Sequence, residues 1–181
     1  MWAAQFIKFD KPNRWLTSGG LGTMGYGFPS AIGVQIAHQE KPVICVTGEA
    51  SFMMNIQEIS TIAQYNLPVK VLILNNSCMG MVRQWQEMFH GERYSESKMQ
   101  GMPDFIKLAE SYGIKGLRAT NVGEVDKVIA EMLATDGPVI VDMVVDPNEN
   151  VYPMIPAGAC HNEIVLGAES RNDDKLDKNQ L

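Results

Sequence analysis

Short apolar runs alternate with longer amphipathic segments along most of the chain. The clearest runs are 43–47, 69–74 and 138–145, which are rich in valine and isoleucine and bounded by turn or polar residues. Such runs predict parallel strands buried on both faces, because a strand that helices cover on both sides has no polar face. Apolar residues also recur at helical spacing in several segments between and around these runs. The predicted helices are 52–65, 81–90, 105–112 and 122–134.

Weaker patterns add further elements. They are helices at 1–9 and 31–37 and strands at 14–17 and 113–118. Alternation of strands and helices with short turns predicts the α/β class, a doubly wound, mostly parallel sheet with helices on both faces. We expect residues 1–147 to form this domain. Residues 148–181 are expected to form a C-terminal tail that is partly disordered, since its last dozen residues are mainly charged or polar.

Composition and charge narrow the function classes. The chain has 181 residues, 45% hydrophobic and 20% charged, which suits one globular domain. A net charge of −6 argues against nucleic acid or an anionic membrane as partner, and no apolar run is long enough to span a bilayer. Cys45, Cys78 and Cys160 have no metal-ligand spacing and leave an odd thiol in any pairing. This favours a reducing compartment, and we expect a cytoplasmic protein.

Polar side chains follow the first two apolar runs. Glu49 and Ser51 come after the first run, and Asn75 and Asn76 follow the second. The carboxyl ends of neighbouring parallel strands line one crevice, so we expect Glu49, Ser51 and Asn76 to converge on one ligand. Carboxylate, amide and carbonyl oxygens are hard donors that suit Mg²⁺, which keeps its other positions for water and phosphate oxygens.

A glycine-rich stretch allows a different interpretation. Gly20, Gly22 and Gly25 spell G-x-G-x-x-G after a possible strand and before a helix. This pattern is typical of a Rossmann domain that binds NAD or FAD, with Glu49 on the ribose. However, residues 14–17 lack the apolar run of a central first strand. The Rossmann interpretation also leaves the two adjacent asparagines without a role.

The segment Gly48-Glu49-Ala50-Ser51, followed by Asn75-Asn76, resembles the thiamine-diphosphate signature, which begins Gly-Asp-Gly or Gly-Asp-Ala and closes with an Asn pair. The stretches 51–58, 66–70 and 80–85 are similar to the large catalytic subunit of acetolactate synthase (acetohydroxyacid synthase). The resemblance runs from Met1 to about Pro156 and implies its C-terminal, diphosphate-binding domain. One departure is Glu49, where that family usually has Asp. The extra methylene requires the turn or the ion to shift, which bears on metal affinity.

The resemblance implies thiamine diphosphate and Mg²⁺ as cofactors, with three groups of site residues. Implied metal ligands are the side chains of Glu49 and Asn76 and the carbonyl of Cys78. Residues implied in binding thiamine diphosphate are Gly22, Met24, Gly48, Ala50, Ser51, Asn76, Met79, Gly80 and Met81. Residues implied in the substrate pocket are Met81, Val82 and Trp85.

Individual roles follow from the same resemblance. Gly22 is expected to offer its carbonyl to the aminopyrimidine ring, and Met24 to lie beneath the thiazolium ring. The loop 75–80 is expected to wrap the diphosphate at a helix N-terminus. Trp85 is expected to favour an acceptor of the size of 2-oxobutanoate.

The implied reaction joins two pyruvates into 2-acetolactate with loss of CO₂, or pyruvate and 2-oxobutanoate into 2-aceto-2-hydroxybutanoate, for branched-chain amino-acid biosynthesis. The full-length enzyme is expected to bind FAD, to form a homodimer or tetramer, and to work with a small regulatory subunit. The activating glutamate is expected in a domain upstream of Met1. This chain alone would then hold no catalytic residue and be inactive. Pyruvate oxidase, glyoxylate carboligase or catabolic acetolactate synthase types remain alternatives, as does a non-catalytic module.

Overall fold

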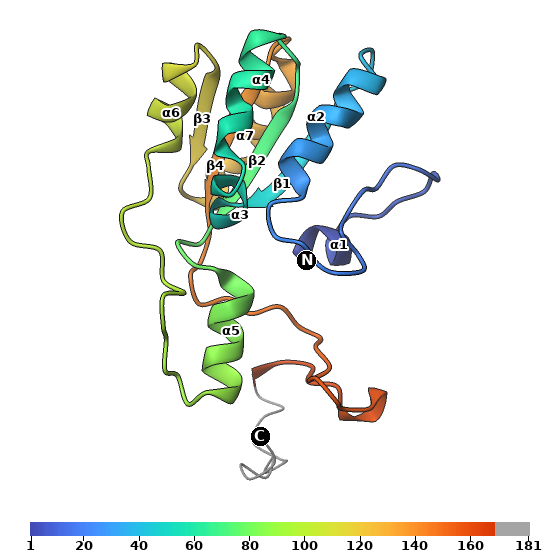
Figure 1. Ribbon diagram of the computed structural model, residues 1–181, viewed down its shortest axis with the longest axis vertical. Coiled ribbons are helices and arrows are strands. Elements are labelled where there is room, and N and C mark those ends of the chain that lie inside the picture. The colour runs from blue at the N-terminus through green and yellow to red at the C-terminus, as the bar shows by residue number, and fades with distance from the viewer. Residues whose placement is uncertain (169–181) are drawn as a thin grey trace.

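A computed structural model describes residues 1–168 as an α/β domain with extended segments at one end (Figure 1). The last dozen residues, expected to be disordered, are 170–181 and lie outside the described residues. The sheet in the described part of the chain has four parallel strands, in the order β1 (Ile44–Gly48), β2 (Lys70–Asn75), β4 (Val139–Val144) and β3 (Lys115–Ala119). No helix among residues 1–168 is both long enough and apolar enough to cross a bilayer.

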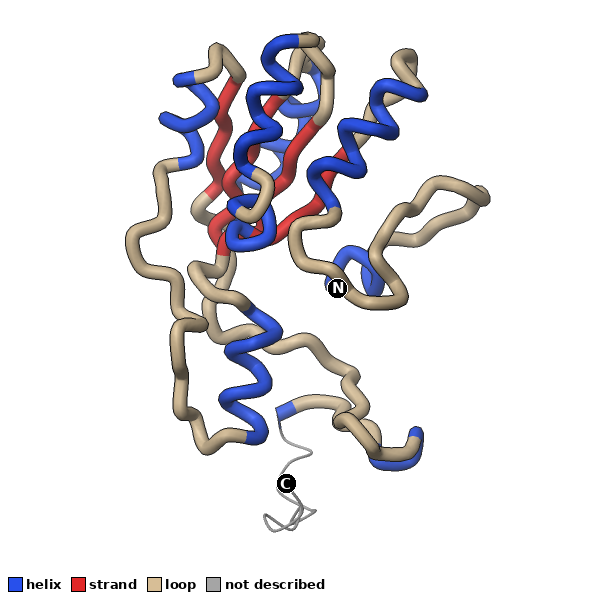
Figure 2. The backbone as a smooth tube through the Cα atoms, in the orientation of Figure 1, coloured by secondary structure: helices blue, strands red, loops and turns tan. Residues whose placement is uncertain are grey.

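Helices cover both faces of the sheet (Figure 2). On one face lie α2 (Gly27–Ala37), α3 (Glu49–Met53), α4 (Ile59–Gln64) and α6 (Phe105–Ser111), and on the other lies α7 (Val122–Ala134). From β1 through β2 to β3 the chain moves in one direction across the sheet, and then it returns to β4. Because crossovers between parallel strands are right-handed, this reversal requires α7 to change face. The predicted doubly wound fold is confirmed.

Three phenylalanines form the centre of the larger half of the core. Phe28, Phe52 and Phe105 come from α2, α3 and α6, and each is at most 1% exposed. The ring centroid of Phe52 lies 4.9 Å from that of Phe28 and 5.9 Å from that of Phe105. Phe52 therefore joins the short helix α3 to the helices on either side.

The structure differs from the predicted elements in several places. The helix predicted at 1–9 is shorter, as α1 (Trp2–Phe6), and the helix predicted at 31–37 begins earlier, as α2. Residues 14–17 form no strand, and their side chains are exposed, so no burial stabilises one there. The predicted helix 52–65 consists of α3, a 3₁₀ turn at Ile56–Glu58 and α4. It breaks at Asn55, whose backbone is not helical and whose side-chain amide donates to the carbonyl of Gly25 at 2.7 Å. Without a strand at 14–17, the G-x-G-x-x-G sequence lacks the context that a Rossmann site requires.

Gly116 marks the close approach of α6 to β3. A Cβ atom at this position would lie 2.9 Å from Cγ2 and 3.0 Å from Cα of Ile106. Since backbone cannot rotate away, Gly116→Ala is expected to lower the free energy of unfolding by about 1–3 kcal/mol, measured by chemical denaturation. Gly33→Ala is the matched control, because a Cβ at Gly33 meets nothing within 4 Å. Equal stability of Gly116→Ala and the wild type would contradict the tight packing of α6.

Candidate functional site

The carboxyl ends of β1 and β2 bring together the side chains of Glu49 and Asn76. Glu49 is the first residue of α3, directly after β1, and Asn76 directly follows β2, the parallel neighbour of β1. The backbone N–H of Cys78 donates to Glu49 Oε1 at 2.7 Å and to Asn76 Oδ1 at 3.1 Å. Two side-chain oxygens thus lie within hydrogen-bond distance of one N–H group, as expected from their positions at neighbouring strand ends.

The backbone of Cys78 faces the side-chain oxygens of Glu49 and Asn76. Cys78 lies opposite Lys98 in an isolated antiparallel bridge, and the residues that flank them make the backbone hydrogen bonds, each 2.8 Å long. Facing residues in such a pair exchange no hydrogen bonds with one another. The N–H and carbonyl of Cys78 therefore point away from Lys98, on the side of Glu49 and Asn76.

Glu49 is almost fully buried, with 1% exposure. Burial raises the pKa of its carboxyl group, and the charge of Asp142 adds to this, while backbone N–H groups that include those of Cys78 and Asn76 act in the opposite direction. No group of three or more His, Cys, Asp or Glu between residues 1 and 168 is arranged to hold a metal ion. The donors at this site are one carboxylate, one amide oxygen and one backbone carbonyl. This set fits Mg²⁺, which uses few carboxylates and completes its shell with water and phosphate oxygens.

The glycine-rich loop is fastened to α3. The N–H of Gly25 donates to Ser51 Oγ at 2.9 Å, and Asn55 donates to the carbonyl of Gly25. Gly25 has a φ of +89°, and a Cβ there would lie 2.7 Å from Asn55 Nδ2, so the position requires glycine. Gly22 and Met24 belong to this loop, and Met24 is 37% exposed. The hydrogen bonds of this loop with α3 and the residues after it are made by Gly25, next to Met24 in the sequence, while the N–H of Gly22 donates to the carbonyl of Ser18.

A helix begins beside Asn76. The helix α5 (Gly80–Phe89) has Met79 as its N-cap, with no side-chain cap, and the N–H groups of a first helical turn have no partner within the helix. A Cβ at Gly80 would lie 3.0 Å from Asn76 Nδ2, so glycine allows the helix to start close to the amide. Such an N-terminus favours an anion. Gly48 and the buried Ala50 flank Glu49 in the sequence.

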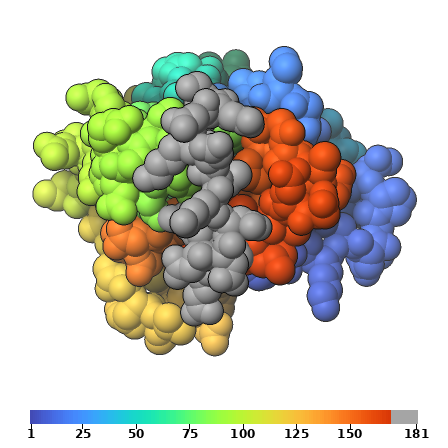
Figure 3. Space-filling view, turned by 90° about the horizontal axis from the view of Figure 1, so that it is seen from below, coloured from blue at the N-terminus to red at the C-terminus, as the bar shows by residue number. Residues whose placement is uncertain are grey.

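Two buried polar residues of α5 hold the segment that follows β4. Arg83 donates to Asn150 Oδ1 at 2.6 Å, and Gln84 both accepts from the N–H of Val151 at 2.7 Å and donates to its carbonyl at 3.0 Å. Both residues are at most 2% exposed. Figure 3 views this side of the molecule, with α5 in green and residues 150–168 in orange and red. The start of the predicted tail is therefore attached to α5.

The residues predicted for a substrate pocket lie on α5, at the second, third and sixth of its ten positions. Val82 and Trp85 line a hollow of about 490 Å³ between α5 and the loop after it, and Met81 does not. The ring of Trp85 packs on Phe89 with centroids 5.0 Å apart. The other lining residues are Gln86, His90, Arg93 and Ser95.

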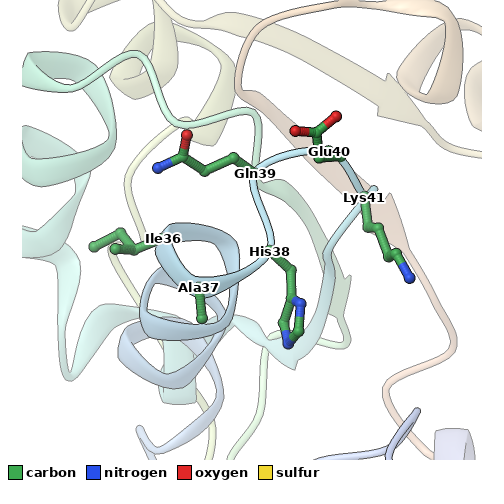
Figure 4. Close-up of a pocket in the computed structure, with 6 residues that line it drawn as sticks. All are labelled: Ile36, Ala37, His38, Gln39, Glu40 and Lys41. Carbon is green, nitrogen blue, oxygen red and sulfur yellow. The ribbon is translucent and has the colours of Figure 1, made fainter.

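A second hollow, of about 300 Å³, lies elsewhere. It is lined by residues 36–41, which are the last two residues of α2 and the turn that follows it (Figure 4). Their side chains diverge from this turn instead of converging. The turn precedes the amino end of β1, whereas Glu49 follows its carboxyl end. This hollow is therefore separate from the candidate site.

A buried carboxylate behind the site was missing from the predicted residues. Asp142, in β4, is 3% exposed, and its two oxygens accept from Asn75 Nδ2 at 2.9 Å and from Arg118 Nε at 3.0 Å. Arg118 also donates to Asp104 Oδ1 at 2.7 Å. This hydrogen bond holds the pKa of Asp104 below its usual value. The sequence signal was a single carboxylate inside the apolar run 138–145.

Comparison with known proteins shows the family to which this chain belongs. The family described as "Thiamine pyrophosphate enzyme, C-terminal TPP binding domain" matches residues 1–143. The chain therefore belongs to the thiamine pyrophosphate enzyme family, as a C-terminal domain that binds this cofactor, which is also called thiamine diphosphate.

Two relatives of this chain within that family are acetolactate synthase large subunits. The chain is 50% identical to the acetolactate synthase large subunit of Cyanidium caldarium over 166 residues, which are 91% of this chain and 28% of the relative. It is 45% identical to the acetolactate synthase isozyme 2 large subunit of Escherichia coli (strain K12), over 91% of this chain and 30% of the relative. The resemblance to acetolactate synthase large subunits is confirmed. The chain spans less than a third of the length of these relatives.

A solved structure has the same fold. It is the Rhodococcus jostii RHA1 thiamine diphosphate-dependent 4-hydroxybenzoylformate decarboxylase, with a TM-score of 0.65 and 29% identity. The match covers 71% of this chain and 24% of that protein.

Proposed function

We propose that this chain is the thiamine-diphosphate-binding part of an acetolactate synthase. The enzyme would join two pyruvates to 2-acetolactate with loss of CO₂, or pyruvate and 2-oxobutanoate to 2-aceto-2-hydroxybutanoate, in branched-chain amino-acid biosynthesis. The observation that carries the cofactor assignment is the convergence of Glu49, Asn76 and Cys78 at the carboxyl ends of β1 and β2. The choice of reaction is supported by the names of the relatives.

The metal is proposed to be Mg²⁺, held by the Glu49 carboxylate, Asn76 Oδ1 and the Cys78 carbonyl. All three are hard oxygen donors, and the remaining positions suit water and diphosphate oxygens. The N-terminus of α5, at Met79 and Gly80, would receive the diphosphate, because its free N–H groups and helix dipole favour an anion.

The organic part of the cofactor would lie between the glycine-rich loop and α5. When bound, thiamine diphosphate supplies the electron sink for keto-acid chemistry. Gly22 would accept a hydrogen bond from the aminopyrimidine, and Met24 would support the thiazolium with an apolar surface. Ser51 would hold the loop through Gly25.

The remaining assignments complete this picture. Gly48 and Ala50 would allow close approach beside Glu49. Met81, Val82 and Trp85 would form the apolar wall that receives the alkyl group of the acceptor and excludes water.

We extend the proposal to the full-length enzyme, which would bind FAD and form a homodimer or tetramer with a small regulatory subunit. Residues 1–147 would be the cofactor-binding domain, and 148–168 an arm held by Arg83 and Gln84. A cytoplasmic location is supported by the three cysteines of the described residues, which are all free thiols.

Titration calorimetry of the purified 181-residue chain tests the cofactor assignment. We expect thiamine diphosphate to bind about tenfold or more tightly with Mg²⁺ than with EDTA, because the diphosphate shares the metal with the protein. NAD⁺ serves as the control ligand and should not bind. Binding of NAD⁺ in place of thiamine diphosphate, or binding that EDTA leaves unchanged, would overturn the assignment.

A further inference from the structure

We propose that Asp142 is a positioning residue for the metal-binding turn. Through Asn75, it would fix the turn 75–78 so that the Asn76 side chain and the Cys78 carbonyl face the cation. This inference rests on the proposed function. It deepens that function by giving roles to Asp142 and Asn75, which are not among the proposed metal ligands.

The side-chain amide of Asn75 connects Asp142 to the turn. Its Nδ2 donates to Asp142 Oδ1 at 2.9 Å, and its Oδ1 accepts from the N–H of Ser77 at 3.1 Å. An ionised carboxylate only accepts hydrogen bonds and a backbone N–H only donates. A single orientation of the amide satisfies both partners, and rotation by 180° would lose both bonds. Asp142 therefore selects the orientation in which Asn75 can hold Ser77.

Ser77 is the point at which the turn needs this support. It has a φ of +55°, in the left-handed region that a residue with a side chain rarely adopts. The hydrogen bond from its N–H to Asn75 Oδ1 closes a turn of the Asx type that spans Asn75 to Ser77 and fixes the N–H of Ser77. The N–H of the next residue, Cys78, then meets Glu49 and Asn76. The direction of Cys78 thus depends on a bond that Asn75 makes.

Asp142 is itself held in place. A buried carboxylate is costly unless it is paired, and here Arg118, opposite Asp142 in the register of β3 and β4, binds Oδ2 at 3.0 Å. Arg118 also donates a hydrogen bond to Asp104, the N-cap of α6. The Asp104 carboxylate in turn accepts from N–H groups in the first turn of that helix. With both oxygens engaged, the Asp142 carboxylate has one available position. A continuous series of bonds therefore runs from α6 to the turn.

Asp142→Asn tests this role, because it keeps the size of the side chain and removes one acceptor oxygen and the charge. Thiamine-diphosphate binding by the full chain is measured at increasing Mg²⁺ concentration. We expect about a tenfold loss of apparent Mg²⁺ affinity, the range found for residues that orient metal ligands, and recovery of cofactor binding at high Mg²⁺. Asp104→Asn is the matched control, since it breaks only the outer, exposed ion pair and should change the affinity by less than about twofold.

Asn75→Ala provides a second variant that leaves the pair of Asp142 and Arg118 intact. It should lose the same Mg²⁺ affinity, and the double variant should lose no more than either single variant, because both act through one bond. A purely structural role would instead lower the free energy of unfolding and leave the Mg²⁺ affinity of the folded chain unchanged.

The possible failures are distinguishable. If the wild type binds the cofactor and both Asp142→Asn and Asn75→Ala bind Mg²⁺ as tightly as it does, this inference alone is overturned. If the wild type fails to bind thiamine diphosphate with Mg²⁺, the proposed function fails and this inference with it.

Discussion

Replacing Asn76 with alanine is expected to weaken Mg²⁺-dependent binding of thiamine diphosphate by about 100-fold or more, since even residues that only orient ligands contribute about 10–100-fold. Asn76 is 8% exposed, and its amide oxygen shares the N–H of Cys78 with the Glu49 carboxylate. Alanine removes this oxygen from the proposed donor set. Calorimetric titration with the cofactor, at fixed Mg²⁺, measures the change.

Asn148→Ala is the matched control, because it makes the same substitution at an exposed position after β4. Denaturation of the Asn76→Ala chain separates binding from folding. The lost hydrogen bond to Cys78 should lower the free energy of unfolding by only about 1 kcal/mol. If Asn76→Ala bound cofactor and metal like the wild type, Asn76 would not be a ligand and the proposed metal site would be wrong.

Phe52→Ala is expected to lower the free energy of unfolding by about 3–5 kcal/mol, the range for loss of a fully buried aromatic ring. Phe52 is 0% exposed and lies between Phe28 and Phe105, so three helices lose their common contact. Because domains of this kind are stable by only about 5–15 kcal/mol, much of the total would be lost. Urea denaturation followed by circular dichroism measures the difference.

Phe6→Ala makes the same change at a ring that is 77% exposed, and it should alter stability by less than about 0.5 kcal/mol. Phe52 also anchors α3, whose first residue is Glu49. The folded Phe52→Ala chain should therefore bind Mg²⁺ and cofactor more weakly as well. A loss of stability below about 1 kcal/mol would contradict the central place of Phe52 in the core.

Much of the fold was predictable because its signals are local. Valine- and isoleucine-rich runs mark β1, β2 and β4, and the helical spacing at 122–134 matches α7 residue for residue. Once the sheet is parallel, neighbouring strand ends must share an edge, which is why Glu49 and Asn76 were expected together. The G-x-G-x-x-G sequence shows the limit of such reasoning, since its interpretation depended on a strand at 14–17, where the residues are exposed and form no strand.

The errors occur where a distant residue decides the local structure. The helix predicted over 52–65 has continuous helical spacing, but Asn55 leaves the helical conformation to bind the carbonyl of Gly25, 30 residues away. The attachment of Asn150 and Val151 to α5 likewise joins residues about 67 positions apart. Periodicity within a short window carries no information about such contacts.

The α/β class, the strands that form the centre of the sheet and the polar residues at their carboxyl ends could be predicted, because each depends on hydrophobic pattern and on the geometry of parallel strands. The pairing of the buried polar groups could not be predicted in this way and is seen only in the folded chain. Asp142 in β4 binds both Asn75 in β2 and Arg118 in β3, because β4 lies between β2 and β3 in the sheet. Hydrogen bonds need a defined partner, distance and angle, whereas burial needs only an apolar surface. The hydrophobic pattern was therefore enough to predict the core, whereas the hydrogen bonds of the site could be known only from the tertiary structure.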